Sequence, residues 1–124
     1  MRTKPRFLLT GSVDLTIQRN TQKGGYVDGR WAEGKYSPVT QKVNIQPMQY
    51  HQTLLLPESE RSKQWFVLYS ACELRASQEG QNGWDADRFE WEGHTYEIMK
   101  ARRWQMGVLD HWEAQAVRVP VTPG

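Results

Sequence analysis

Hydrophobic and polar residues alternate in several short runs along this 124-residue chain. In residues 12–19 the apolar side chains of Val13, Leu15 and Ile17 alternate with polar ones, which is the pattern of a strand with one buried face. The same spacing runs from Val39 to Ile45 and stops at Pro47, since proline cannot donate a ladder hydrogen bond. Residues 64–70 are apolar on both faces, which is typical of a central strand.

Turn signals separate these runs. Residues 20–25 contain a glycine pair and predict a break. Asp28-Gly29 predicts a tight turn, because glycine accepts the positive φ that such turns require. Gly34 and Pro38 interrupt the next segment, so we expect its strand to begin near Val39.

The most regular pattern lies in residues 84–119. Residues 88–91 and 94–100 are rich in aromatic and β-branched side chains, and Glu92-Gly93 between them suits a hairpin turn. On the second run, Ile98 and Lys100 are expected to share a face. A third run follows Gly107, and the three together predict an antiparallel meander.

The fold class predicted by this pattern is all-β. We expect a small antiparallel β-barrel or sandwich of about six strands, with at most one short helix. Only 38% of the residues are hydrophobic, but six Trp, five Tyr and three Phe can fill a thin core. Residues 1–124 are interpreted as one domain, with an N-terminal arm at 1–11 and a flexible tail at 120–124.

Residues 48–64 are the least strand-like interior segment. Pro57 followed by Glu58 and Glu60 suits the first turn of a short helix. Alternatively the whole segment is a long loop between strands, and it either stays a plain surface loop or docks on a partner.

Net charge and cysteine content limit the kinds of partner and the cellular compartment to be considered. The formal net charge is only +2, which gives no general case for nucleic-acid binding. Cys72 is the single cysteine, which excludes an internal disulfide framework and favours folding in a reducing cytoplasm. We interpret Cys72 as a small buried hydrophobic residue. The sequence contains neither a signal-peptide core nor an apolar run long enough for a membrane span, so we expect a soluble protein with no membrane partner.

The sequence offers little for catalysis. Asp85, Asp87 and His94 are the best candidates for an enzyme site, but nothing beyond their presence supports one. His51 and His111 are too far from His94 to suggest a metal site by spacing. We therefore expect no catalytic residues, no metal, no cofactor and no enzymatic activity.

A basic and aromatic cluster closes the second run of the meander. Arg102, Arg103 and Trp104 could grip a phosphate and stack on a base. A turn with solvated arginines and one packed tryptophan, or the rim of a protein interface, explains the same residues. Both interpretations stay open.

Taken in order, several motifs resemble one family. The chain carries Leu-Thr-Ile-Gln-Arg at 15–19, Gly-Arg-Trp at 29–31, Val-Asn-Ile-Gln-Pro at 43–47, Leu-Pro-Glu at 56–58, Leu-Arg at 74–75, Asp-Arg-Phe-Glu-Trp-Glu-Gly-His-Thr-Tyr-Glu-Ile at 87–98 and Asp-His-Trp at 110–112. Over residues 12–117 this order resembles the head–tail joining, or head-closure, proteins of tailed bacteriophages. The segment at 48–64 is longer than in that pattern.

The resemblance implies a function in the virion neck. Such proteins assemble in the host cytoplasm into a homo-oligomeric ring that joins the portal and adaptor to the tail-terminator or tail proteins. They help to close the head, and packaged DNA passes through the ring. A tail-completion or tail-terminator-like protein, and a stand-alone nucleic-acid-binding barrel that uses Arg102, Arg103 and Trp104, are the alternatives.

By this hypothesis the segment at 48–64 faces the channel or the adjoining ring. Arg61 and Lys63 would then meet DNA or an acidic partner. The full candidate set on the segment is Tyr50, His51, Leu54, Leu55, Arg61 and Lys63. Unpaired strand edges would supply part of the contact between copies.

Overall fold

The computed structural model describes residues 12–80, 82–104 and 111–120. Its strands are β1 (Ser12–Gln22), β2 (Gly25–Val27), β3 (Arg30–Ala32), β4 (Lys35–Pro47), β5 (Trp65–Ser70), β6 (Arg88–Trp91), β7 (His94–Trp104) and β8 (His111–Arg118). Two short helical segments, α2 (Tyr50–Thr53) and the 3-10 turn η1 (Glu58–Glu60), lie between β4 and β5. The predicted arm at 1–11 and nearly all of the predicted tail lie outside the described residues.

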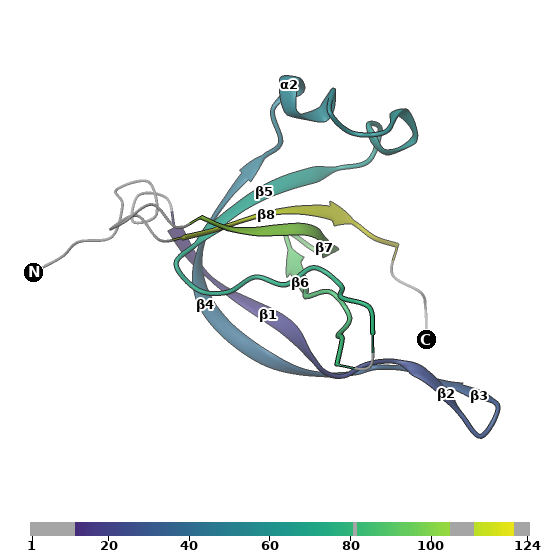
Figure 1. Ribbon diagram of the computed structural model, residues 1–124. Helices are drawn as coiled ribbons and strands as arrows, with labels where there is room; N and C mark the ends of the chain where they lie inside the picture. Colours follow the sequence, from purple (N-terminus) through teal and green to yellow (C-terminus); the bar gives the residue numbers. More distant parts are fainter. Residues whose placement is uncertain (1–11, 81, 105–110, 121–124) are drawn as a thin grey trace, which may run out of the picture.

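Six of the strands close into an antiparallel barrel in the order β1-β4-β5-β8-β7-β6, which confirms the predicted fold class (Figure 1). β6, β7 and β8 form the expected meander. β1 and β4 pair over most of their length, from Ser12 with Asn44 to Gln22 with Lys35. Beyond that point the same ribbon continues as a separate β2–β3 hairpin. No helix in the described residues is long and apolar enough to cross a membrane.

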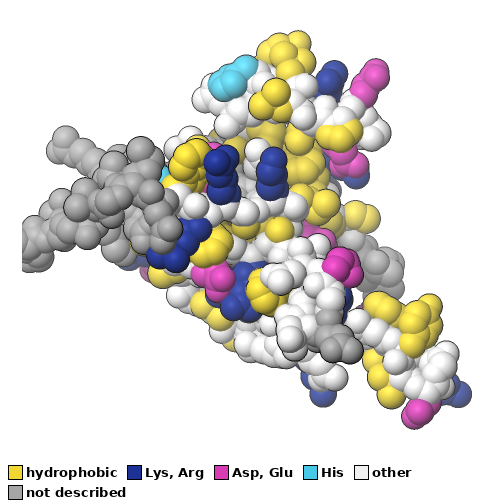
Figure 2. Space-filling model, viewed as in Figure 1, with side chains coloured by type: hydrophobic (Ala, Val, Ile, Leu, Met, Phe, Trp, Pro, Cys, Tyr) yellow, Lys and Arg dark blue, Asp and Glu magenta, His cyan; other side chains and the backbone are white. Residues whose placement is uncertain are grey.

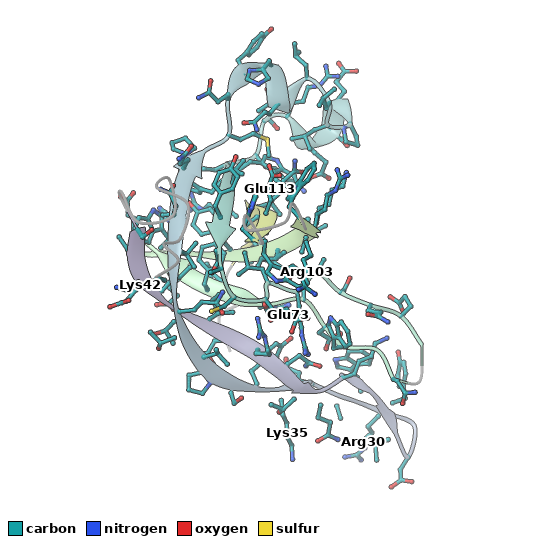
Figure 3. All side chains as sticks on the ribbon, turned by 60° about the vertical axis from the view of Figure 1, so that its left-hand side comes forward. Arg30, Lys35, Lys42, Glu73, Arg103 and Glu113 are labelled. Carbon is teal, nitrogen blue, oxygen red and sulfur yellow. The ribbon has the colours of Figure 1, made fainter. Side chains whose placement is uncertain are left out.

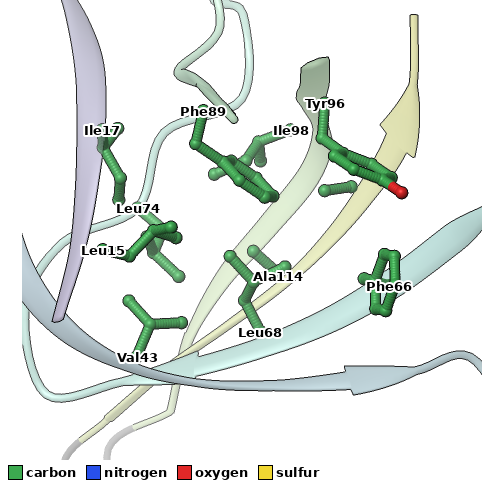
Figure 4. Packing of buried hydrophobic residues seen from close by; sticks show 11 residues of the cluster. Leu15, Ile17, Val43, Phe66, Leu68, Leu74, Phe89, Tyr96, Ile98 and Ala114 are labelled. Carbon is green, nitrogen blue, oxygen red and sulfur yellow. The ribbon is translucent and has the colours of Figure 1, made fainter. Parts of the chain in front are cut away.

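The core fills the barrel with alternate side chains from every wall (Figure 4). Phe89 and Tyr96 stack with ring centroids 5.5 Å apart, and Phe66 meets Tyr96 edge-on at 5.1 Å. These aromatic pairs supply the area that a chain poor in aliphatic residues needs. Smaller side chains complete the cluster: Leu15, Ile17, Val43, Leu68, Leu74, Ile98, Ala114 and Ala116.

Both predicted tight turns are present. Asp28 and Gly29 have φ of 52° and 78°, and Glu92 and Gly93 have φ of 51° and 81°. Two successive positive φ angles are the signature of the turn that matches the twist of a hairpin. The β2–β3 and β6–β7 hairpins therefore form where the sequence predicted them.

Two predicted strand limits in the β1–β4 ribbon are wrong, although the chain does break at Gly24, between β1 and β2, and at Gly34, between β3 and β4. β4 already begins at Lys35 and includes Pro38, which pairs with Gln18 of β1. Only the end of β4 pairs with β5, so Pro38 faces no second strand that would require its missing N–H. β1 likewise continues to Gln22 through a register shift, where the side-chain amide of Asn20 donates to the Gln22 carbonyl at 2.9 Å.

The expected alternation along β7 fails after Ile98. The register against β8 shifts between Ile98 and Lys100, so Met99 is an extra residue and is 54% exposed. Lys100 therefore does not share the buried face of Ile98, and Ala101 packs against the core instead. The prediction for Cys72 is also wrong, because this residue follows β5 at the surface and is exposed.

A buried ion pair ties the loop between β5 and β6 to the barrel. Asp87 is fully buried and accepts from Arg19 Nε at 3.2 Å and Nη2 at 2.9 Å. The carboxylate also accepts the backbone N–H of Arg75, and Arg19 Nη2 donates to the Glu73 carbonyl. The hydrogen bond to Asp87 raises the pKa of the Arg19 guanidinium above its ordinary value. This loop is therefore a fixed part of the wall.

Candidate functional site

Two segments project from the barrel on different sides (Figure 1). One is the β2–β3 hairpin, at the far end of the β1–β4 ribbon. The other is the segment at 48–64, which carries α2 and η1. Hydrophobic side chains gather on both projections in the space-filling view (Figure 2).

The segment at 48–64 has an ordered frame of backbone contacts. Gln49 and Gln52 form a reciprocal capping box at the start of α2. Arg61 donates from Nε to the Leu56 carbonyl and from Nη2 to the Leu54 carbonyl, each at 3.1 Å. The indole N–H of Trp65, at the start of β5, donates to the Glu60 carbonyl at 2.9 Å. The predicted short helix after Pro57 is present as the 3-10 turn Glu58–Glu60.

The candidate residues on this segment divide into two kinds. Tyr50 and Leu55 are 79% and 86% exposed, and Leu54 is 46% exposed. His51 is also exposed. Arg61 donates to the carbonyls of Leu54 and Leu56. Lys63 forms an ion pair with Glu60 at 2.9 Å. The apolar members therefore face solvent, while the two cations are engaged within the segment itself.

The hairpin carries the residues that sequence reasoning missed. Tyr26, Val27 and Trp31 are 77%, 59% and 61% exposed. Tyr26 and Trp31 are cross-strand partners, and their rings meet edge-on with centroids 5.4 Å apart. The available signal was the aromatic residue on each side of Asp28-Gly29, because a two-stranded hairpin too short to enter a core leaves such rings outside.

The basic and aromatic cluster at the end of β7 makes contacts within β7 and with β8. The guanidinium of Arg102 lies over the Trp104 ring, 4.1 Å from its centroid. The Trp104 indole N–H donates to Glu113 Oε2 at 2.8 Å. Arg103 is exposed and pairs in the ladder with Trp112, and Figure 3 marks Arg103 and Glu113. One face of the indole is therefore covered by a cation from its own strand.

The barrel closes only narrowly between β1 and β6. The two strands pair at Ile17 with Phe89 and at Gln18 with Arg88. Next to this seam lies a groove of about 730 Å³, which we call the seam groove. It is lined by Asp14, Leu15, Thr16, Gln18, Tyr36, Arg88, Phe89, Glu90, Trp91 and Thr95.

The candidate catalytic carboxylates serve the fold. Asp87 is the buried partner of Arg19. Asp85 Oδ2 accepts the backbone N–H of Gly24 at 3.1 Å, and the Asp85 N–H donates to Asn20 Oδ1. His94 lies opposite Trp91 beside the β6–β7 turn, half-buried. In the described part of the chain, no three His, Cys, Asp or Glu side chains are placed to hold a metal ion.

No protein-family model matches the sequence, and no curated protein matches it.

Proposed function

We propose that this chain is a structural subunit of the neck of a tailed phage, where copies form a ring between the portal and adaptor of the head and the tail. The ring would help to close the DNA-filled head. The ordered series of motifs over residues 12–117 supports this function, as does the antiparallel barrel that the resemblance implies.

The single observation that carries the proposal is the pair of exposed apolar projections on different sides of the barrel. A ring requires a heterologous interface, in which one surface of each copy meets a different surface of the next. Tyr26 and Trp31 on the hairpin give each copy an apolar surface for the next copy, and Tyr50 and Leu55 on the other side give it a separate apolar surface for an adjoining ring. A protein that works alone has no need to expose both.

The contacts within the segment at 48–64 modify the hypothesis for its residues. Arg61 and Lys63 already bind groups of their own segment, so their first role is to hold its shape. We propose that Tyr50, Leu54 and Leu55 make the contact with the portal, adaptor or tail ring. DNA in the channel would meet cations elsewhere on the ring.

Cryo-electron microscopy of assembled particles tests the function. A ring of these barrels between portal and tail is the expected result. Density for this barrel at the far end of the tail tube, or none in the particle, would overturn the proposal. A position at the head-proximal end of the tail, still attached when tails are purified without heads, would instead identify a tail-completion protein.

A further inference from the structure

We propose that the β2–β3 hairpin of one copy docks in the seam groove of the next copy. The inference rests on the proposed function and deepens it, because it names the two surfaces that meet in the ring. The occupant is a second copy of this chain, and the docked residues are Tyr26, Val27 and Trp31.

The seam groove has the properties of a docking site. β1 pairs with β6 only at Ile17 and Gln18, so Ser12–Thr16 has β4 on one side and no other strand of the described chain on the other. A strand edge of this kind accepts a further strand. Trp91, which is half-buried, supplies an aromatic ring to the groove, whereas Leu15 and Phe89 belong to the core and are only 4% and 1% exposed. Its volume of about 730 Å³ falls within the range of about 300–1,000 Å³ typical of binding pockets.

The hairpin has the properties of the occupant. Both of its aromatic rings are mostly exposed, and tryptophan and tyrosine are the residues that most often anchor an interface. The hairpin extends the β1–β4 ribbon away from the barrel (Figure 1). Trp31 also lines a second pocket of its own copy together with Tyr36 and Arg88, which are residues of the seam groove as well. Each copy offers one hairpin and one groove, and two different surfaces of this kind are what a heterologous interface between copies requires.

Charges on the two surfaces are complementary. Glu90 lines the groove, and neither Glu90 nor Arg30 has an ion pair within the described residues. Arg30 lies beside the hairpin turn, clear of the barrel (Figure 3). A docked hairpin brings Arg30 to the Glu90 carboxylate. Asp28, also at the turn, then meets Arg88, whose existing pair with Glu97 is on the surface.

Cross-linking between two single-cysteine variants tests the contact. Both carry Cys72→Ser, because Cys72 is exposed. One adds Val27→Cys on the hairpin and the other Thr16→Cys in the groove, and a short bismaleimide is applied to the equimolar mixture. We expect a heterodimer that neither variant forms alone, with the two cysteines joined in peptide mapping.

Leu55→Cys replaces Val27→Cys in the matched control, because Leu55 is at least as exposed but lies on the other projection. A yield with Leu55→Cys equal to that with Val27→Cys overturns the docking. Adding Trp31→Ala to the hairpin variant is expected to lower the heterodimer yield at least about tenfold, as removal of an interface anchor does. An unchanged yield also overturns it.

Charge reversal supplies an independent test. Arg30→Glu on the hairpin variant, or Glu90→Arg on the groove variant, is expected to reduce the yield by about threefold, the effect of one ion pair at an interface rim. Combining the two reversed partners should restore it. If the heterodimer yield with both reversals is lower than the yield with either reversal alone, the assigned pairing of Arg30 with Glu90 is wrong. If the cross-linking and charge-reversal results contradict the docking while microscopy shows a neck ring, the docking proposal is wrong and the proposed function is retained.

Discussion

The interior of the barrel and its two projections use the same kinds of residue in opposite ways. Leu68 on β5 is fully buried, whereas Leu55 in the segment at 48–64 is 86% exposed. Phe89 and Tyr96 stack inside the core, whereas Tyr26 and Trp31 make their ring contact in solvent. Folding accounts for the first member of each pair. The second member is apolar surface that folding leaves in water, and we propose that assembly buries it.

Ion pairs show the same contrast. Arg19 and Asp87 meet inside the wall, where the carboxylate has three protein donors and is fully buried. Asp14 and Lys42 meet at 3.1 Å on the outer face of the barrel, with both side chains about two-thirds exposed. The first pair fixes the loop that precedes β6. The second is solvated and contributes little to folding.

Removing the buried carboxylate is expected to cause the largest loss of stability. Asp87→Ala leaves the Arg19 guanidinium in the wall without its charged partner, with only the Glu73 carbonyl as acceptor, which costs about 3–5 kcal/mol in the free energy of unfolding. Asp14→Ala is the matched control and should cost less than about 1 kcal/mol. Urea unfolding of both variants measures the difference. Similar losses would mean that the Arg19–Asp87 pair is as solvated as the surface pair.

The two leucines provide the next test. Leu68→Ala leaves a cavity in the core and should cost about 2–5 kcal/mol. Leu55→Ala removes a side chain that folding leaves in water, so its effect should stay within about 0.5 kcal/mol. Urea unfolding of the two variants provides the comparison. A large loss for Leu55→Ala would show that the segment packs within its own copy and is not free for a partner.

The regular half of the fold could be read from the sequence. Alternating apolar positions predicted β1, β5 and the C-terminal part of β4. The Asp28-Gly29 and Glu92-Gly93 pairs predicted both hairpin turns. What failed was the rule that Pro38 must delay the start of β4, and the predicted extent of the break at residues 20–25, which occupies only Lys23 and Gly24 between β1 and β2. A strand tolerates proline where no neighbouring strand needs the missing N–H, and the sequence of one strand does not reveal which strands lie beside it.

The candidate site was less predictable for the same reason. The sequence located the segment at 48–64 and its exposed apolar residues, but it also assigned Arg61 and Lys63 to contact with DNA or an acidic partner, because free cations suggest such a contact. Their partners are nearby carbonyl and carboxylate groups, which only the folded segment brings into reach. The seam groove arises from strands that are about 70 residues apart in sequence, and no local motif reports that they pair over only two positions.

Gly83 lies in the loop between β5 and β6, and Gly25 lies in the projecting hairpin. Substituting each of them compares the packing of the two regions. A Cβ on Gly83 would clash with the Gln78 carbonyl oxygen, next to the bridge between Gln78 and Trp84. Gly83→Ala must therefore shift this loop and should cost about 1–3 kcal/mol. A Cβ on Gly25 meets nothing within 4 Å, so Gly25→Ala should change stability by less than about 0.5 kcal/mol. Thermal unfolding distinguishes the two, and equal effects would contradict the close packing at Gly83.

The smallest expected effect is a loss of stability at alkaline pH. Burial raises the pKa of the Tyr96 phenol above its ordinary value of 10.0. Near pH 10 the unfolded chain releases this proton while the folded chain keeps it. The unfolded state then binds fewer protons, so the free energy of unfolding falls as the pH rises from 10.0 towards the higher pKa of the folded state.

Tyr96→Phe tests the origin of this slope. Urea unfolding between about pH 8 and about pH 11 should show a shallower decline for the variant than for the original chain. The decline should not vanish, because burial also raises the pKa of Tyr36 and of Tyr69. At neutral pH the variant keeps the ring that stacks on Phe89 and meets Phe66, so its stability there should change little. An equally steep decline in Tyr96→Phe would mean that the hydroxyl at position 96 is as accessible to water in the folded barrel as in the unfolded chain.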